Sequence, residues 1–478
     1  MIILYIALLL LVALLGVIFI RALIFRPKPQ NFGTPEKIEF NGDEAISALA
    51  ELVKCKTISY YDGSLEDDAE FQKLEDLLPK LYPNVIRRCE LTKLDSRALL
   101  FRWQGQSSQE PTVLMAHYDV VPVNEQNWGK PPFSAIIEDG VMWGRGTLDT
   151  KVTFNGILFA ANTLIGMGYV PKNDIYLAFS GGEEINGDGA KNIVDYFENN
   201  GITPALVVDE GGGVVEDVFP GVKKQCALIG IAEKGMINLE FNTVSAGGHA
   251  SAPAPHTPIG ILAKACAKTE NNPFKMHLTE PAAQMFNVLG RHSSFVYRLI
   301  FANLWLFKPV LDLIAQKSGG EMNALLRTTV AFTQAYGSSA PNVIPPKASL
   351  VANLRLNPQD SMQKAVEYIK KTINDDTVEL NVLGGMEPSR VSVTNCEAYK
   401  KVEMAVANTW EGALVSPYLM VQCSDCRHYG RISDKVYRFS AMHLTKEERA
   451  TIHGNNERIR LEQVKKATEF FIRLIKQC

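Results

Sequence analysis

The sequence predicts an α/β protein with a mixed, mostly parallel sheet flanked by helices, an inserted α+β domain of ferredoxin-like type, and an N-terminal transmembrane helix. Three patterns lead to this prediction. Short apolar runs alternate with helical segments over residues 43–235, which is typical of a mostly parallel sheet. Strands with one polar face replace them over 236–386, which is typical of antiparallel pairing. Residues 2–20 carry no charge.

These patterns divide the chain of 478 residues, which is long enough for two or three domains. We expect a transmembrane anchor at 1–25 and a linker rich in Pro, Gly and charge at 26–42. The first part of a large domain follows at 43–235, an inserted domain at 236–386, and the second part of the large domain at 387–478.

The N-terminal run IILYIALLLLVALLGVIFI is long enough to cross a bilayer, because its nineteen residues would form a helix of roughly 29 Å. A cleaved signal peptide is the alternative. However, no Lys or Arg precedes the run, and Arg21 follows it without a small-residue cleavage pattern, so we favour a retained anchor. Arg21, Arg26 and Lys28 favour the cytoplasmic side for the large domain, although the sequence leaves the side open.

The large domain begins with a helical pattern at 43–55, and two further helical patterns follow at 155–168 and 189–201. Short apolar strands are expected between them, and each ends in polar residues or glycine, at 98–105, 112–120, 175–180 and 204–213.

The inserted domain has a different pattern of polar and apolar residues. We expect half-exposed strands at 237–246, 328–337, 348–356 and 378–383, and helices near 258–270 and 361–375. A long apolar helical segment covers 283–318. Arg298, Lys308 and Asp312 interrupt its most apolar part, so we do not expect that part to span a membrane.

The composition excludes several classes of protein. A hydrophobic content of 46% and a net charge of −3 indicate an ordinary globular body without the basic imbalance of a nucleic-acid-binding protein. The eight cysteines are too sparse for a disulfide scaffold. Cys423 and Cys426 form a lone C-x-x-C, which is a poor zinc signal without a second pair, so we interpret them as isolated thiols.

Histidines and carboxylates follow the ends of several predicted strands, where ligands gather in open parallel sheets. They lie in the segments HYD (117–119), TLD (147–149), EE (183–184), DE (209–210) and IHG (452–454). Imidazole and carboxylate ligands suit zinc, manganese or cobalt, and a carboxylate can bridge two such ions. The sequence therefore predicts a metal centre, with two ions favoured over one.

The adjacent Glu183 and Glu184 support this prediction. Two carboxylates about 4 Å apart repel by roughly 4 kcal/mol at an effective dielectric near 20. A divalent cation beside one of them removes that repulsion and leaves the other free to take a proton.

The ordered motifs resemble the co-catalytic zinc family of aminoacylases, carnosinases, glutamate carboxypeptidase and carboxypeptidase S, over roughly residues 45 to 475. The resemblance is greatest to the carboxypeptidase S and N-fatty-acyl-amino-acid hydrolase branch. It is carried by MAHYDVVPV, PPFSAIIEDGVMWGRGTLDTK, SGGEEINGDGA, VVDEGG, AGGHASAP, PNVIPP, NLRL and IHGNNER, and for the branch by SDCRHYG and VYRFS.

The resemblance implies two zinc ions per subunit, with cobalt or manganese as substitutes. His117 and Asp209 would bind one ion, Glu184 and His453 the other, and Asp149 would bridge them. Members of the family place either acid of the Asp209–Glu210 pair in the ligand position. We favour Asp209, because it directly follows the apolar strand.

The resemblance also implies catalytic and substrate-binding residues. Glu183 would be the general base, Asp119 would orient the imidazole of His117, and His249 would stabilise the oxyanion from a partner subunit or after domain closure. Asn342 and Arg355 would hold the carboxylate of the substrate.

The resemblance therefore implies an amidohydrolase that cleaves the bond before a free C-terminal amino acid, in small peptides or in N-acyl-amino acids. The large domain would be catalytic, and the inserted domain would serve as a lid or as the interface of a homodimer. A membrane-tethered binding protein that has lost catalysis is the alternative, and the complete set of ligands and base argues against it. A phosphoesterase would need more cations around the metals.

Overall fold

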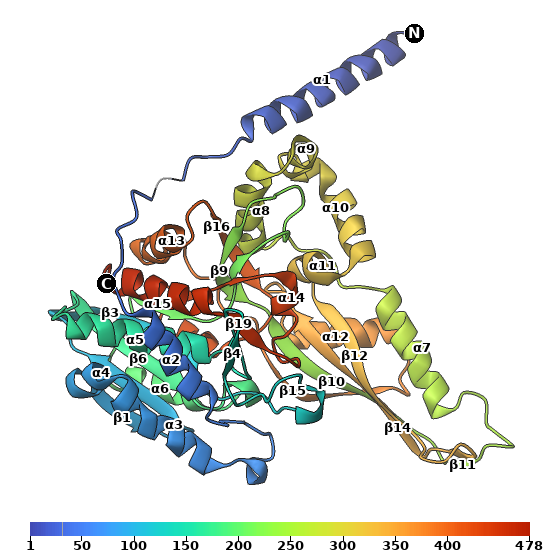
Figure 1. Cartoon of the computed structure of the whole chain (residues 1–478). Helices are drawn as coiled ribbons and strands as arrows, with labels where there is room; N and C mark the ends of the chain where they lie inside the picture. Colours follow the sequence, from blue (N-terminus) through green and yellow to red (C-terminus); the bar gives the residue numbers. More distant parts are fainter. Residues whose placement is uncertain (31) are drawn as a thin grey trace.

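The computed structural model describes residues 1–30 and 32–478. Helix α1 (Ile2–Ile24) projects from the body of the molecule, which is built around one large and one small sheet (Figure 1). Within the described residues, α1 is the one single helix that is long and apolar enough to cross a membrane.

The large sheet is mixed and contains ten strands within the described residues, in the order β1-β2-β6-β3-β7-β17-β9-β8-β18, with β16 paired to β9. Parallel pairs join β6, β3, β7 and β17, whereas β1, β2 and β8 pair antiparallel with at least one neighbour. The strands are β1 (Glu90–Leu94), β2 (Ala98–Trp103), β3 (Ser107–His117), β6 (Asn173–Ser180), β7 (Leu206–Asp209), β8 (Gly213–Val215), β9 (Cys226–Glu233), β16 (Leu414–Met420), β17 (Val436–Arg438) and β18 (His443–Leu444).

Helices cover both faces of this sheet, as the alternating pattern predicts. On β6, Leu177 and Phe179 belong to one hydrophobic core and Tyr176 and Ala178 to another, because successive side chains of a strand point to opposite faces. The first core packs against α2 (Gly42–Val53), α3 (Asp68–Leu81), α4 (Pro83–Arg88), α5 (Lys151–Gly166), α13 (Glu397–Thr409) and α15 (Leu461–Ile475), and the second against α6 (Gly189–Asn199).

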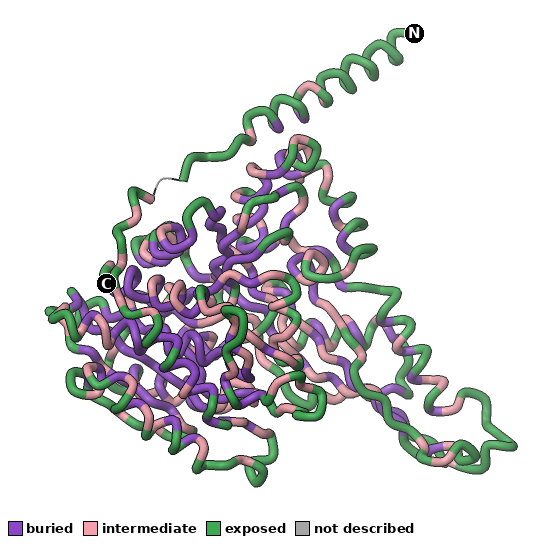
Figure 2. Tube along the Cα trace, viewed as in Figure 1, coloured by how far each residue is buried: buried purple, intermediate pink, exposed green. Residues whose placement is uncertain are grey.

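Purple buried segments accordingly fill this layered part of the molecule (Figure 2). All eight cysteines are free, as expected for isolated thiols. A short three-stranded sheet of β4 (Ile136–Glu138), β5 (Val141–Trp143) and β19 (Arg458–Arg460) joins the loop before α5 to the C-terminal segment.

The inserted domain contains the predicted ferredoxin-like arrangement. Its antiparallel sheet has the order β12-β14-β10-β15, which is the order of a β-α-β-β-α-β unit. Its elements are β10 (Gly235–Val244), α7 (Pro258–Asn271), β12 (Thr329–Tyr336), β14 (Lys347–Leu356), α12 (Met362–Ile373) and β15 (Glu379–Met386). A ribbon of β11 (Gly248–His249) and β13 (Val343–Ile344) extends from its tip (Figure 1).

The long apolar segment between α7 and β12 does not pack on the small sheet. It forms α8 (Glu280–His292), α9 (Phe295–Phe301), α10 (Leu304–Ser318) and α11 (Gly320–Leu326). Met285, Phe286 and Leu311 of these helices share a core with Leu228 of β9 and Leu419 of β16. The segment is therefore inserted in sequence but rests on the large sheet, while the predicted domain boundaries stay a prediction.

Candidate metal centre

Parallel pairing brings the predicted polar residues to one edge of the large sheet. His117 ends β3 and pairs with Ser180, the last residue of β6, and the neighbouring β7 ends at Asp209. Because these three strands run in the same direction, the residues that follow them share one edge.

Asp119 holds this edge together. Its Oδ1 accepts a hydrogen bond from the Glu183 amide at 3.1 Å, and its Oδ2 accepts one from the Glu184 amide at 3.2 Å. Its Oδ1 also lies 3.3 Å from Nδ1 of His117, and its backbone oxygen lies 3.0 Å from the same atom. Asp119 thus orients the imidazole and fixes the turn that carries both glutamates.

A first cluster surrounds Nε2 of His117. This atom lies 3.0 Å from Oδ1 of Asp149 and 3.1 Å from Oε1 of Glu210. Oε2 of Glu183 lies 4.0 Å away. One buried imidazole nitrogen therefore faces three carboxylates.

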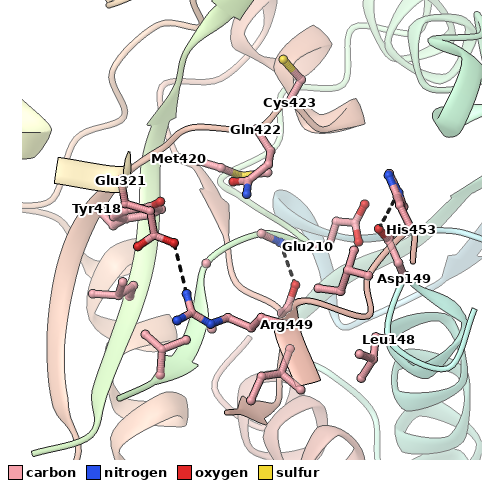
Figure 3. A pocket seen from close by; sticks show the side chains of 18 of the residues that line it. Leu148, Asp149, Glu210, Glu321, Tyr418, Met420, Gln422, Cys423, Arg449 and His453 are labelled. Atoms are coloured by element: carbon pink, nitrogen blue, oxygen red, sulfur yellow. Dashed lines mark hydrogen bonds and ion pairs between the residues drawn. The ribbon is translucent and has the colours of Figure 1, made fainter. Parts of the chain in front are cut away.

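A second cluster surrounds Nε2 of His453. It lies 3.0 Å from Oδ2 of Asp149 and 3.0 Å from Oε2 of Glu184. Asp149 therefore takes part in both clusters, with a different oxygen in each. Figure 3 shows Asp149 between the two, with His453 on one side and Glu210 on the other.

Asp209 and Glu210 point in different directions. Oδ2 of Asp209 accepts a hydrogen bond from the Cys426 amide at 2.9 Å, and the side chain is buried. Glu210 instead faces His117 and lines the cavity described below. The choice of Asp209 as a ligand thus stays a prediction, and the geometry favours Glu210, the alternative that the sequence left open.

The electrostatics of the edge reflect this concentration of acids. Burial raises the pKa of Glu183 well above its usual value, and Asp425, Glu210 and Glu184 raise it further. Burial likewise raises the pKa of Glu210 to about 7. These raised pKa values indicate that the neighbouring positively charged side chains compensate the negative charge at this edge only in part.

The pKa values of His117 and His453 are also raised, but by the neighbouring carboxylates and against the effect of burial. Burial alone would lower the pKa of His117, but the facing Glu210, Asp119 and Asp149 raise it well above its usual value. Hydrogen bonds to Asp149 and Glu184 raise the pKa of His453 to about 10. In both cases the neighbouring carboxylates stabilise the charged form of the imidazole.

The side chains fit divalent cations. Two groups of ligand atoms lie close enough to share an ion, His117 with Asp149 and Glu184, and His117 with Glu183 and Glu210. Oε1 of Glu184 is buried without a hydrogen-bond partner, although such atoms are normally satisfied. A cation would satisfy this oxygen, and mixed imidazole and carboxylate donors suit zinc, manganese or cobalt.

Glu457 is a supporting residue that sequence reasoning missed. This fully buried carboxylate accepts hydrogen bonds from Arg145 and from the Gly146, Leu148 and Asp149 amides, at 2.6, 3.1, 2.7 and 3.3 Å. It therefore fixes the loop that carries Asp149. The available signal was its position four residues after His453, in the motif IHGNNER.

A cavity of about 900 Å³ opens from the metal centre. Arg355 lines it, with Nη1 3.3 Å from Sγ of Cys423. Arg449 and Glu321 form an ion pair of 3.2 Å across another part of it, as Figure 3 shows. Much of the remaining wall is apolar and comes from Val214, Val215, Val218, Leu228, Tyr418, Met420, Met442, Leu444 and Ile452.

Two predicted residues lie elsewhere. His249 is exposed on β11, where its Nδ1 lies 2.7 Å from Oγ of Ser251. Asn342 precedes β13, and its backbone oxygen accepts a hydrogen bond from the Ala250 amide. Both belong to the ribbon at the tip of the inserted domain, far from the metal centre in Figure 1. Neither lines the cavity of its own chain.

The position of Glu457 yields a prediction. Glu457→Gln keeps the size of the side chain but removes the charge that faces Arg145 and presents an amide to backbone N–H groups. We expect a loss of about 10–100-fold in zinc affinity, measured by competition with a chromogenic chelator, because the loop of Asp149 is no longer held.

Glu462→Gln, at an exposed position of α15, is the matched control and should keep the affinity of the parent protein. Equal affinities for all three proteins would contradict the supporting role of Glu457.

The chain also resembles known proteins over most of its length. Residues 113–477 match the family described as Peptidase family M20/M25/M40. The chain is 35% identical over 441 residues to "Probable carboxypeptidase S-like 2" of Dictyostelium discoideum, covering 91% of this chain and 85% of that protein. It is 33% identical over 476 residues to "N-fatty-acyl-amino acid synthase/hydrolase PM20D1" of Xenopus tropicalis, covering 97% and 93%.

Among solved structures, an M20 family metallo-carboxypeptidase from Sulfolobus solfataricus, Sso-CP2, superimposes with a TM-score of 0.67 at 20% identity, covering 91% of this chain and 99% of that one. This likeness confirms the predicted fold, and the sequence matches confirm the resemblance drawn from the motifs. Because the family match spans most of the chain, the protein belongs to peptidase family M20/M25/M40, whose members depend on a dinuclear metal centre.

Proposed function

We propose that this protein is a di-zinc amidohydrolase that releases a free C-terminal amino acid from an N-acyl-amino acid. The observation that carries the proposal is the sharing of Asp149, whose two oxygens each face one histidine at 3.0 Å. This is the arrangement that a carboxylate needs to join two ligand sets around one reacting centre.

The proposed ligands are His117 and Glu210 for one ion and Glu184 and His453 for the other, with Asp149 shared. Bound zinc would polarise the amide carbonyl and raise the acidity of water. Glu210 replaces Asp209 in this proposal, because Glu210 faces His117 while Asp209 accepts the Cys426 amide.

Glu183 is the proposed general base. Its carboxylate is largely buried and lines the cavity, and burial raises its pKa, which makes the carboxylate a stronger base than an exposed glutamate. Oε2 would accept a proton from the attacking water and then donate it to the amide nitrogen as the C–N bond breaks. Asp119 would keep Glu183 in place through the hydrogen bond to its amide.

Arg355 is the proposed partner of the substrate carboxylate. It comes from β14 of the inserted domain, lines the cavity, and is supported by a hydrogen bond of 3.1 Å from its Nε to Oδ1 of Asn353. Its planar guanidinium suits a carboxylate. Asn342 and His249 would complete substrate binding and oxyanion stabilisation from a partner subunit or after closure, since they do not line the cavity of their own chain.

The acyl group is proposed to occupy the apolar part of the cavity. The cavity volume of about 900 Å³ exceeds what a dipeptide requires and lies within the range of sites for larger ligands. The Xenopus relative is named for N-fatty-acyl-amino acids, which supports this choice over small peptides.

Helix α1 is proposed to anchor the enzyme in a membrane. Its 23 residues are exposed except for the buried Ile18 and Ala22 and the half-buried Leu14 and Gly16, which is unusual for an apolar helix in water. The charges that follow it favour the cytoplasmic side for the catalytic domain. A secretory signal sequence is the competing reading of the same helix.

Replacing the proposed base tests the reaction. Glu183→Gln should reduce kcat for an N-acyl-amino acid by about 10²–10⁴-fold while zinc content stays unchanged, because Gln cannot accept the proton. Asp188→Asn, at an exposed position in the same loop, is the control. Retained turnover in Glu183→Gln would exclude it as the base, and an inactive parent protein with full zinc content would favour a binding protein.

The two acids after β7 can be separated by metal analysis. Glu210→Gln should lower zinc content from two ions per chain toward one, because it removes a carboxylate that faces His117. Asp209→Asn should retain both ions, since the amide oxygen can still accept the Cys426 N–H. The reverse pattern would restore Asp209 as the ligand.

The acyl site predicts a dependence on chain length. For a series of N-acyl-glycines, kcat/KM should rise by up to about fourfold for each added methylene until the cavity is filled. Val218→Trp should remove this rise and spare the short substrates, because Val218 lines the apolar wall.

Val170→Trp, at an exposed position away from the cavity, should retain the dependence on chain length. A parent enzyme indifferent to acyl length would contradict the proposed acyl site.

A further inference from the structure

Helices α9 and α10 carry a group of exposed apolar side chains. On α10, Leu306, Val310 and Leu313 repeat at helical spacing on one face, and Leu311 and Ala315 are buried on the opposite face. The helix is therefore apolar on both sides. With their fractional exposures, the exposed residues are Val296 (68%), Tyr297 (41%), Trp305 (57%), Leu306 (36%), Val310 (46%), Leu313 (53%) and Ile314 (51%), and we call them the α9–α10 patch.

The patch lies beside the foot of α1. The rings of Phe19 and Phe295 meet edge to face, with centroids 5.5 Å apart. Nδ2 of the buried Asn303 donates a hydrogen bond to the Ile18 oxygen at 3.0 Å. These specific contacts fix α9 against the last two turns of α1, and Figure 1 shows the lower end of α1 beside α9.

Further contacts lie just beyond. Nε of Arg21 donates a hydrogen bond of 3.1 Å to the Ala302 oxygen, and the Arg291 guanidinium lies over the Phe25 ring at 4.4 Å. The body therefore contacts the chain from Ile18 to Phe25, at the C-terminal end of α1, whereas most residues before Ile18 are exposed.

The end of the apolar run sets the depth of α9 relative to the membrane. Arg21 is the first charge after this run, so in a spanning α1 Ile18 and Phe19 lie at the end of the hydrocarbon layer. Because Asn303 and Phe295 contact those two residues, α9 lies at the boundary of the hydrocarbon layer.

We propose that the α9–α10 patch docks on the surface of the lipid bilayer that α1 spans. This inference rests on the proposed anchoring role of α1. The axes of α9 and α10 differ by 108°, so the pair forms an elbow suited to lying on a membrane instead of a straight second span. Trp305 and Tyr297 have the ring types that concentrate at membrane interfaces.

The charges around the patch fit an interface. Lys308 and Lys317 of α10 are exposed and can extend their amines toward headgroups while their methylenes stay with the acyl chains. Arg21 of α1 contacts Ala302, directly after α9. Docking also places α11 near the membrane, and its Glu321 lines the proposed acyl cavity.

Quenching of tryptophan by brominated lipid tests the docking. The full chain, with tryptophans 103, 128, 143, 305 and 410, is reconstituted in phosphatidylcholine vesicles brominated near the headgroup. We expect clear quenching that Trp305→Phe abolishes. The matched control is Trp410→Phe, which removes a tryptophan buried in the catalytic core and should leave the quenched intensity unchanged. Unchanged quenching in Trp305→Phe would overturn the proposal.

A second reporter separates docking from anchoring. Leu9→Trp in the Trp305→Phe protein places a ring in the middle of α1, where lipid brominated deep in the acyl chain should quench it. Quenching at position 9 without quenching at position 305 overturns the docking and leaves the anchor standing. No quenching at either position overturns both, while the reaction proposed for the metal centre is unaffected. If Trp305 is shielded from aqueous acrylamide but quenched by lipid bromine, the result would support docking. If Trp305 is shielded from acrylamide and is not quenched by lipid bromine, the result would indicate that a second protein copy covers the patch and would overturn the docking.

Discussion

The structure depends on one carboxylate that is shared between two histidines. Asp149 can face both His117 and His453 only if the end of β3 and the C-terminal segment meet over the loop before α5. The parallel pairing of β6, β3 and β7 supplies the first part of this requirement, and the β5–β19 pairing supplies the second, because β19 follows His453 closely in the chain. The fold is therefore arranged around the approach of residues more than 300 positions apart.

Such a cluster is costly unless its charges are compensated and its ligands are held. Buried carboxylates lose hydration, and several like charges at one edge repel each other. The protein limits this cost with buried hydrogen bonds outside the cluster: Asp119 accepts both glutamate amides, and Glu457 accepts the amides of the Asp149 loop. These two acids contact the proposed ligands without lining the cavity, and they hold the geometry of the cluster in place before a cation binds.

Much of this could be predicted from sequence, because local patterns determine it. Period-two and helical spacing predicted both sheets, and strand-end polar residues predicted the metal centre. Side-chain direction could not be predicted: at the end of β7, the pleat and the following glycines decide that Glu210 faces His117 and Asp209 faces Cys426. Long-range packing could not be predicted either. No local pattern shows that α8–α11 rest on β9 and β16, or that β11 places His249 outside the cavity of the metal centre of its own chain.

The most direct test of the account is anomalous diffraction at the zinc edge from crystals grown with excess zinc. We expect two peaks about 3.5–4 Å apart, one contacting His117 and Glu210, the other contacting Glu184 and His453, and both contacting Asp149. A single peak, or two peaks of which only one contacts Asp149, would contradict it.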